Sequence, residues 1–194
     1  MKKLLLLVVV LIPAFAHAQF NKGDAFLGGT ISGSSDFSNN LSVSPFFGFF
    51  LNSKISLGGR VEYGSTRSEQ NLTANDGSTS HLVTSTKSFF VAVVGRKYYP
   101  LSDKFFFALQ GELNYGRSNV MNENNGVESH DDVYSLGLNV KPVFAYFPSP
   151  KWGIEGSVGS LGYTFSKALS GSSNHIASLD AGTVTLGFAY YFRK

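Results

Sequence analysis

Downstream of the N-terminal apolar segment, three histidines are the residues best suited to proton transfer or metal binding: His81, His130 and His175. A lipid deacylase would need a His-x-Ser pair with a carboxylate nearby to orient the imidazole. Neither His81 nor His175 begins such a pair. The run His130-Asp131-Asp132 could bind a metal, but one histidine beside two adjacent carboxylates is a weak pattern, and a solvated loop is the expected setting. The sequence therefore predicts no catalytic residue, metal or cofactor, and a protein that is not an enzyme.

Charged residues on the polar faces of predicted strands form a second candidate set. Three are cations and three are anions, and Gln110 and Asn139 share their faces. Charges in a narrow, low-dielectric interior must be paired and hydrogen-bonded. Balanced signs predict a cross-strand network that plugs a lumen, and a narrow, gated water or ion path is the functional alternative. The predicted network consists of Arg60, Glu62, Arg96, Glu112, Lys141 and Glu155.

Strands must position these side chains. The segment 104–117 alternates most clearly, with Phe105, Leu109 and Leu113 on one face and Gln110 and Glu112 on the other. Several segments reach the roughly 9–11 residues that a tilted membrane-spanning strand requires. Eight strands are predicted, at 25–33, 41–50, 55–67, 84–99, 104–117, 133–147, 152–165 and 180–192.

The connections between these segments alternate in length. Three are short, at 51–54, 100–103 and 148–151, and they alternate with longer Ser/Asn/Asp/Gly-rich segments near 34–40, 68–83, 118–132 and 166–178. Tight turns at one face and long loops at the other are typical of an all-β, eight-stranded, antiparallel up-and-down transmembrane barrel.

Alternation alone leaves open which face is inside, because a soluble lipocalin-like barrel or a sandwich also alternates. Aromatic residues at both ends of the strands favour the membrane arrangement, since they suit two interfacial belts. One group lies near the short turns (Phe49, Phe50, Tyr98, Tyr99, Phe105, Trp152, Tyr190, Phe192) and the other lies toward the long loops (Tyr63, Tyr115, Tyr134, Tyr163).

Some segments break the pattern. Residues 88–95 are nearly apolar on both faces, so the register around Arg96 stays open. The strand 152–165 changes phase after Gly159, which predicts a β-bulge. Pro45 and Pro142 each remove a ladder donor, so local bulges are expected at both.

The N-terminus has the parts of a secretion signal. Lys2 and Lys3 precede an apolar run at 4–12, and small residues at 16 and 18 predict cleavage before Gln19. The predicted division is a signal peptide at 1–18 and a barrel domain at 19–194. No cysteine is present for disulfides or a lipid anchor, and without the two lysines 14 basic residues face 13 acidic ones. No basic tract indicates nucleic-acid binding.

The C-terminal segment resembles the signal read by the barrel assembly machinery. A polar Thr185 is followed by Gly187, Tyr190 and Phe192 at intervals of two, five and seven residues. With the strand count and connection order, this makes the chain resemble the small eight-stranded outer-membrane β-barrels of Gram-negative bacteria, such as the OmpX/Ail-like proteins, the OmpA membrane domain and the porin-family β-barrel domain.

The resemblance implies a monomer in the cell outer membrane, in contact with lipid and lipopolysaccharide and inserted by the assembly machinery. A structural and surface-interaction role, with an unidentified extracellular ligand bound by the loops, is the expected function. The alternatives are a narrow porin, a lipid A-modifying enzyme and a soluble lipocalin-like binding protein.

Overall fold

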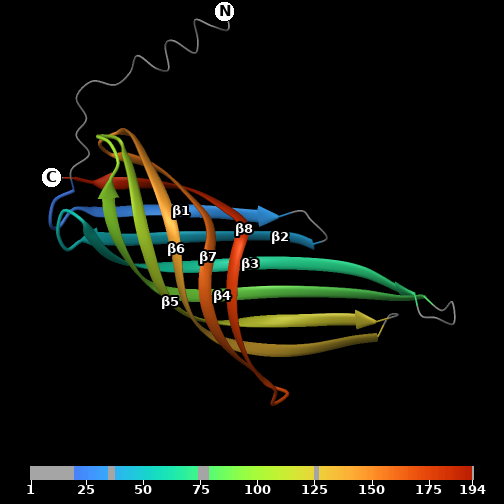
Figure 1. The fold of residues 1–194 in the computed structure, drawn as a ribbon. Helices are drawn as coiled ribbons and strands as arrows, with labels where there is room; N and C mark the ends of the chain where they lie inside the picture. The colour runs from blue at the N-terminus through green and yellow to red at the C-terminus, as the bar shows by residue number, and fades with distance from the viewer. Residues whose placement is uncertain (1–19, 35–37, 74–78, 125–126, 194) are drawn as a thin grey trace, which may run out of the picture.

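Eight antiparallel strands, paired in chain order, form a closed barrel in this computed structural model, which describes residues 20–34, 38–73, 79–124 and 127–193 (Figure 1). β1 closes the ring against β8, from the pair Ala25 and Phe192 to the pair Ser32 and Thr185. The predicted eight-stranded up-and-down barrel is confirmed. Its strands are β1 (Ala25–Ser34), β2 (Ser38–Phe50), β3 (Ile55–Thr73), β4 (Thr79–Pro100), β5 (Phe105–Asn124), β6 (Val127–Ser149), β7 (Trp152–Ala168) and β8 (Ser173–Phe192).

The barrel has two unlike ends. At the turn end, short connections join β2 to β3, β4 to β5 and β6 to β7, and both ends of the described chain lie there (Figure 1). The opposite end is the loop end. The described part of the chain contains no helix long and apolar enough to cross a membrane. The predicted signal peptide at 1–18 and its cleavage site lie outside the described residues.

At the loop end, the expected long loops are mostly strand. β3 and β4 stay paired as far as Thr73 and Thr79, and β5 and β6 as far as Asn124 and Val127. The prediction that 68–83 and 118–132 are loops is therefore wrong for most of both segments. Their polarity does not indicate a loop, because a hairpin that extends into water continues its backbone ladder without needing an apolar stripe.

The outer wall of the barrel is apolar, whereas polar side chains fill the middle of the interior. Leu113 and Leu138 are 53% and 57% exposed on the outside, whereas Gln110 and Glu112 are 1% and 3% exposed inside. A soluble barrel would place its apolar face inward, and soluble proteins rarely expose so continuous an apolar surface. This inverted alternation is the arrangement of a transmembrane barrel.

Two predicted belt residues belong to the interior instead. Phe50 and Tyr98 are buried inside the barrel, because they share the parity of the inward positions on β2 and β4. The outer wall near the turn end still carries exposed aromatic residues, including Phe49, Tyr99, Phe105, Trp152 and Phe192, and the level nearer the loop end carries Tyr63, Tyr115, Tyr134 and Tyr163.

Of the three β-bulges predicted from the sequence, the structure has irregularities at two positions, near Gly159 and Pro142. The register of β7 against β8 shifts between Val158 and Ser160, around Gly159 at a positive φ of 71°, so the predicted bulge is confirmed. At Pro142 the register of β6 against β7 shifts as well. At Pro45 it does not: the β2–β3 pairing resumes in the same register, so the prediction of a bulge there is wrong.

Candidate functional site

All six charged residues of the predicted network lie inside the barrel, where each is brought in by a strand position of inward parity. In the half nearer the loop end, Glu112 of β5 is the central acceptor. Its carboxylate lies 2.6 Å from Arg60 Nη2 and 3.0 Å from Lys141 Nζ. Glu62 pairs with the same arginine, and Arg60 Nη1 also donates to Ser44 over 3.3 Å.

The half nearer the turn end is built on one arginine. Arg96 Nη1 donates to both carboxylate oxygens of Glu155, at 3.0 and 2.8 Å, and the Tyr191 hydroxyl donates to the same carboxylate over 2.9 Å. The guanidinium of Arg96 lies 4.9 Å from the centre of the Phe46 ring. The register left open by the sequence therefore places Arg96 inward, between Ser56 of β3 and Gln110 of β5.

Gln110 joins the two halves. Its amide oxygen accepts a hydrogen bond from Arg96 Nε over 2.5 Å, and its amide nitrogen donates to Glu112. The result is one polar network that crosses the lumen from β3 to β8. Each buried charge in it faces an opposite charge, as burial at low dielectric requires.

The lumen is wider on the loop side of this network than within it. A cavity of about 200 Å³ lies on the loop side, lined mainly by hydroxyl groups together with Arg60, Glu62 and Asn139. At the level of Arg96 the open spaces shrink to about 20 and 10 Å³, which is roughly the room that one water molecule needs. The network is thus the narrowest polar layer of the barrel.

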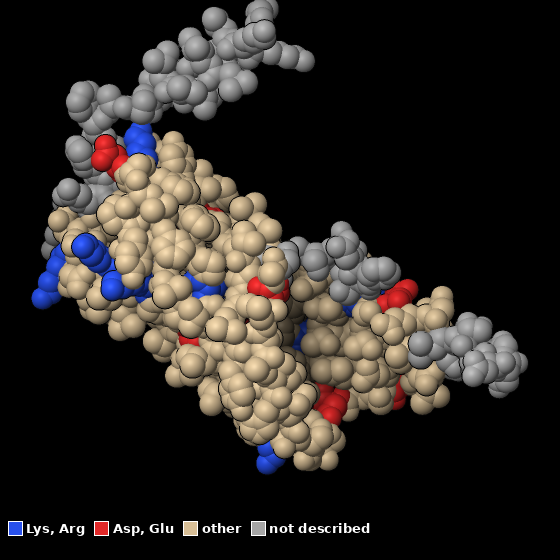
Figure 2. Space-filling model, in the orientation of Figure 1, with Lys and Arg blue, Asp and Glu red and all other residues tan. Residues whose placement is uncertain are grey.

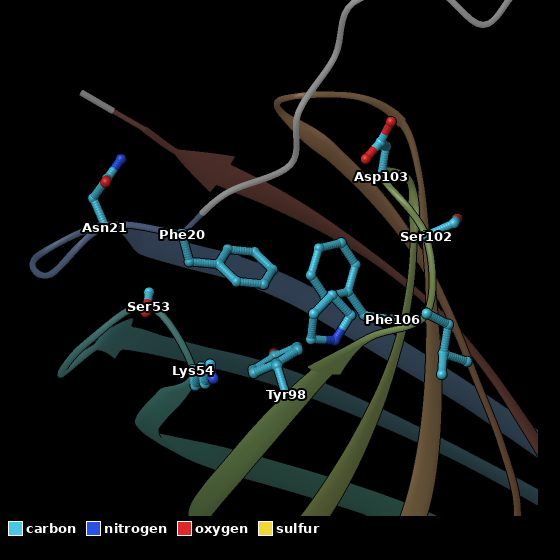
Figure 3. Close-up of a pocket in the computed structure, with 10 residues that line it drawn as sticks. Phe20, Asn21, Ser53, Lys54, Tyr98, Ser102, Asp103 and Phe106 are labelled. Atoms are coloured by element: carbon cyan, nitrogen blue, oxygen red, sulfur yellow. The ribbon is translucent and has the colours of Figure 1, made fainter.

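A second layer, made of aromatic rings, closes the barrel at the turn end, and the sequence analysis missed it. Its central ring is Phe20, which lies ahead of β1, is 2% exposed and stacks on Phe50 with ring centres 4.1 Å apart. Figure 3 shows Phe20 pointing into the barrel toward Phe106 and Tyr98. The guanidinium of Arg193 lies 5.0 Å from the Phe20 ring. The other rings of this aromatic layer are Phe26, Phe147 and Tyr191.

Strand parity could have revealed most of the aromatic layer. Phe106 lies four positions from Gln110 and six from Glu112, so the alternation that places those polar residues inside places this ring inside too. No such signal exists for Phe20, because it precedes the first strand. A turn holds it there: Gly23 N donates to Phe50 O over 2.9 Å, and Gly23 has a positive φ of 91°.

The three histidines lie on separate hairpins and do not converge. His81 Nδ1 lies 2.8 Å from Asn71 Oδ1, and His175 Nδ1 lies 2.8 Å from the Tyr163 hydroxyl. His130 Nε2 lies 3.6 Å from a Glu128 oxygen. No group of three metal-binding side chains occurs among the described residues.

Of the two carboxylates beside His130, that of Asp131 links two hairpins and that of Asp132 binds within one. Ser170, between β7 and β8, donates its hydroxyl to Asp131 over 2.6 Å. Arg117 of β5 makes two bonds to Asp132, at 3.0 and 2.5 Å. Asp131 and Asp132 lie on β6 between Tyr134 and the loop end. The Ser170 hydroxyl lowers the pKa of Asp131, and the Arg117 guanidinium lowers the pKa of Asp132.

The four residues of the predicted assembly signal lie along β8. Thr185 lines the polar cavity and Gly187 is buried, whereas Phe192 is exposed on the outer wall. Tyr190 packs its ring against Trp152, with centres 5.2 Å apart. Recognition of this segment by the assembly machinery stays a prediction.

No protein-family model and no curated protein matches the chain. Solved structures do. The chain is similar to Neisserial surface protein A, with 16% identity and a TM-score of 0.46 over 86% of this chain and 95% of that one. It is similar to a major outer membrane protein from Thermus thermophilus, with 14% identity and a TM-score of 0.49 over 87% and 99% of the two chains. It is also similar to the outer membrane protein OprG from Pseudomonas aeruginosa, with 11% identity and a TM-score of 0.49 over 91% and 99%. The similar structures are small outer-membrane β-barrels, the class that the sequence resembles.

Proposed function

We propose that this chain is an exported, monomeric barrel of the outer membrane whose role is structural and in surface interaction. The observation that carries the proposal is the continuous apolar outer wall around a buried ion-pair network, with polar hairpins that extend at the loop end. Short turns at the other end belong on the periplasmic side, as in bacterial barrels of this size.

The extended hairpins are the proposed interaction surface. They continue β3–β4 and β5–β6 well past the outer aromatic residues Tyr63 and Tyr115, so they stand in water beyond the lipid. Their ladders make them more rigid than the loops expected from the sequence. A rigid, polar hairpin offers preorganised contacts to a ligand at little entropic cost.

We also propose that the lumen is plugged. The ion-pair network supports this, because it spans the interior and leaves only water-sized space, and the aromatic layer lies beneath it. A barrel of eight strands encloses a space that side chains can just fill.

Outer-membrane fractionation followed by gel electrophoresis of unheated and boiled samples tests the main proposal. A closed barrel runs as a compact band before boiling and as a slower band afterwards, in the outer-membrane fraction. A protein that is soluble without detergent and shows no shift would overturn the proposal, and the apolar wall would then need another partner.

A narrow channel is the second candidate, favoured by the polar cavity of about 200 Å³ on the loop side of the network. Single-channel recording in planar bilayers separates the two. A plugged lumen gives no steps for the wild-type protein. Steps that change in Glu112→Gln, which removes the charge facing Arg60 and Lys141, would support conduction through the network.

A further inference from the structure

One backbone position recurs at the turn end, just before each strand that runs toward the loop end. Its carbonyl accepts the amide of an aromatic residue at the end of a neighbouring strand. Lys54 O accepts from Tyr98 N over 2.7 Å, and Lys104 O accepts from Phe147 N over 2.8 Å. The third instance joins Lys151 O to Tyr191 N over 2.8 Å, and the fourth joins Asp24 O to Phe50 N over 2.8 Å.

Three of these four equivalent positions carry lysine. Because the backbone bond is the same in each, the lysines stand at one level around the mouth of the barrel. Lys54 and Lys151 are exposed and Lys104 is half-buried. Two more exposed lysines, Lys22 and Lys97, lie at the same end. We call the set Lys22, Lys54, Lys97, Lys104 and Lys151 the basic rim.

Little acidic charge offsets the basic rim in the described part of the turn end. Asp24 is fully buried and its carboxylate accepts the Asn21 amide over 2.9 Å, which leaves Asp103 as the exposed carboxylate of the three turns. On the face of the barrel shown in Figure 2, most of the Lys and Arg side chains, drawn in blue, lie at the turn end.

The described loop end carries no such excess of basic charge. Beyond the outer aromatic residues, acidic side chains outnumber basic ones among the described residues, and two of the basic ones, Arg67 and Arg117, pair with Glu69 and Asp132. The positive charge of the described barrel is therefore concentrated at the turn end.

The basic rim lies beside the aromatic residues of the outer wall. Lys104 directly precedes Phe105 and Lys151 directly precedes Trp152, both of which are exposed. Lys97 Nζ lies 5.4 Å from the centre of the Tyr99 ring. Aromatic rings of this kind lie at the level of lipid headgroups, and lysine side chains near a membrane surface extend their ammonium groups to that level.

We propose that the basic rim binds the phosphate groups of anionic phospholipids in the leaflet at the turn end. Five ammonium groups at headgroup depth form a ring of point charges, each with three donors, which matches phosphate oxygens from several lipids at once. A basic residue at an anionic surface contributes up to roughly fivefold in association. The inference rests on the proposed placement of the barrel in a membrane.

Lipid selectivity of the full barrel tests the inference. Wild-type protein is reconstituted in phosphatidylcholine vesicles with spin-labelled phosphatidylglycerol or spin-labelled phosphatidylcholine, and the motionally restricted fraction of each label is measured. We expect a preference for phosphatidylglycerol of roughly two- to fivefold at low salt, with loss of most of it at high salt because exposed charges are screened.

The variant Lys54→Gln/Lys151→Gln should lower the preference at least twofold, because it removes two exposed charges of the rim. The matched control is Lys87→Gln/Lys167→Gln, which removes two exposed lysines at the loop end and should leave the preference unchanged. Inorganic phosphate at matched ionic strength should not compete, since the proposed ligand is a lipid headgroup.

The contrary results distinguish failure of the lipid-binding inference from failure of the membrane placement on which it rests. No preference in the wild-type protein, an equal loss in both variants, or competition by free phosphate would overturn the inference even if the protein shows the heat-dependent gel shift. If a rim variant fails to fold, the salt dependence of the wild-type preference still decides. Absence of the gel shift would instead overturn the membrane placement itself.

Discussion

At the scale of single residues, Phe20 contributes most to closing the turn end, although it belongs to no strand. Its ring contacts rings from β2, β4, β5, β6 and β8. Replacing Phe20 by alanine should lower the free energy of unfolding by about 3–5 kcal/mol, because a buried ring is lost and a cavity remains. Urea titration of the barrel refolded into lipid vesicles without residues 1–18 measures this. Phe20→Leu, which keeps much of the volume, should cost distinctly less; equal losses would contradict a packing role.

Glu112 and Glu62 allow a matched test of the ion-pair network, since both pair with Arg60 but differ in burial. The side chain of Glu112 is 2% exposed and that of Glu62 is 26% exposed. Glu112→Gln leaves Arg60 and Lys141 short of a counter-charge and should cost about 3–5 kcal/mol in unfolding free energy. Glu62→Gln should cost about 1 kcal/mol or less. Urea titrations of the two variants would contradict the central role of Glu112 if their losses were similar.

At the scale of the strands, alternation in the sequence was sufficient to predict the number of strands and the inward position of five of the six charged residues, whereas it left the register around Arg96 open. It did not predict how far the hairpins extend, because polar residues in water carry no apolar stripe whether they are paired or looped. It also could not place Phe20, whose position depends on a turn and on rings from distant strands. Strand parity also predicts that the rings of Phe50 and Tyr98 point inward, although their position near the short turns favours the outer belt.

The β7–β8 hairpin is fastened to β6 by the carboxylate of Asp131, which accepts from Ser170, and this contact should depend on pH. The Ser170 hydroxyl lowers the pKa of Asp131 in the folded barrel. Stabilisation by a carboxylate of lowered pKa is present above its ordinary value of about 4 and is lost as pH falls through the folded value. The amide of Leu169, which donates to Asp132 O over 2.9 Å, reports on the contact.

Hydrogen exchange, normalised to intrinsic rates, should therefore show less protection of Leu169 below about pH 4 than at pH 7. Ser170→Ala should reduce its protection at pH 7 and weaken the pH dependence, because it removes the hydroxyl that holds Asp131. The amide of Tyr98, which donates to Lys54 O at the turn end, is the internal control and should be unaffected. Protection of Leu169 that stays constant down to about pH 3 would rule out the carboxylate contact as the fastening.

At the scale of the whole molecule, the barrel divides into a lower part that holds the lumen network and aromatic layer and an upper extension of β3 to β6, in which β4 also pairs with β5 as far as Leu82 and Asn124. This division predicts that the β3–β4 extension can be removed without loss of closure. Joining Gly64 to Ser88 through an Asn-Gly turn deletes residues 65–87 while keeping the outer aromatic pair Tyr63 and Phe89. The shortened barrel should keep its heat-dependent gel shift, since no residue of the network or the aromatic layer is lost.

A deeper deletion provides the control for this prediction. Deletion of residues 61–91 removes the aromatic pair, Glu62 and part of the apolar wall in addition to the hairpin extension. The remaining parts of β3 and β4 are then too short to span the lipid, so closure of the barrel should fail. If both deletions close, the lumen network matters less to the fold than its burial indicates. If neither closes, the hairpins are part of the folding unit, and a role confined to surface interaction would no longer account for their length.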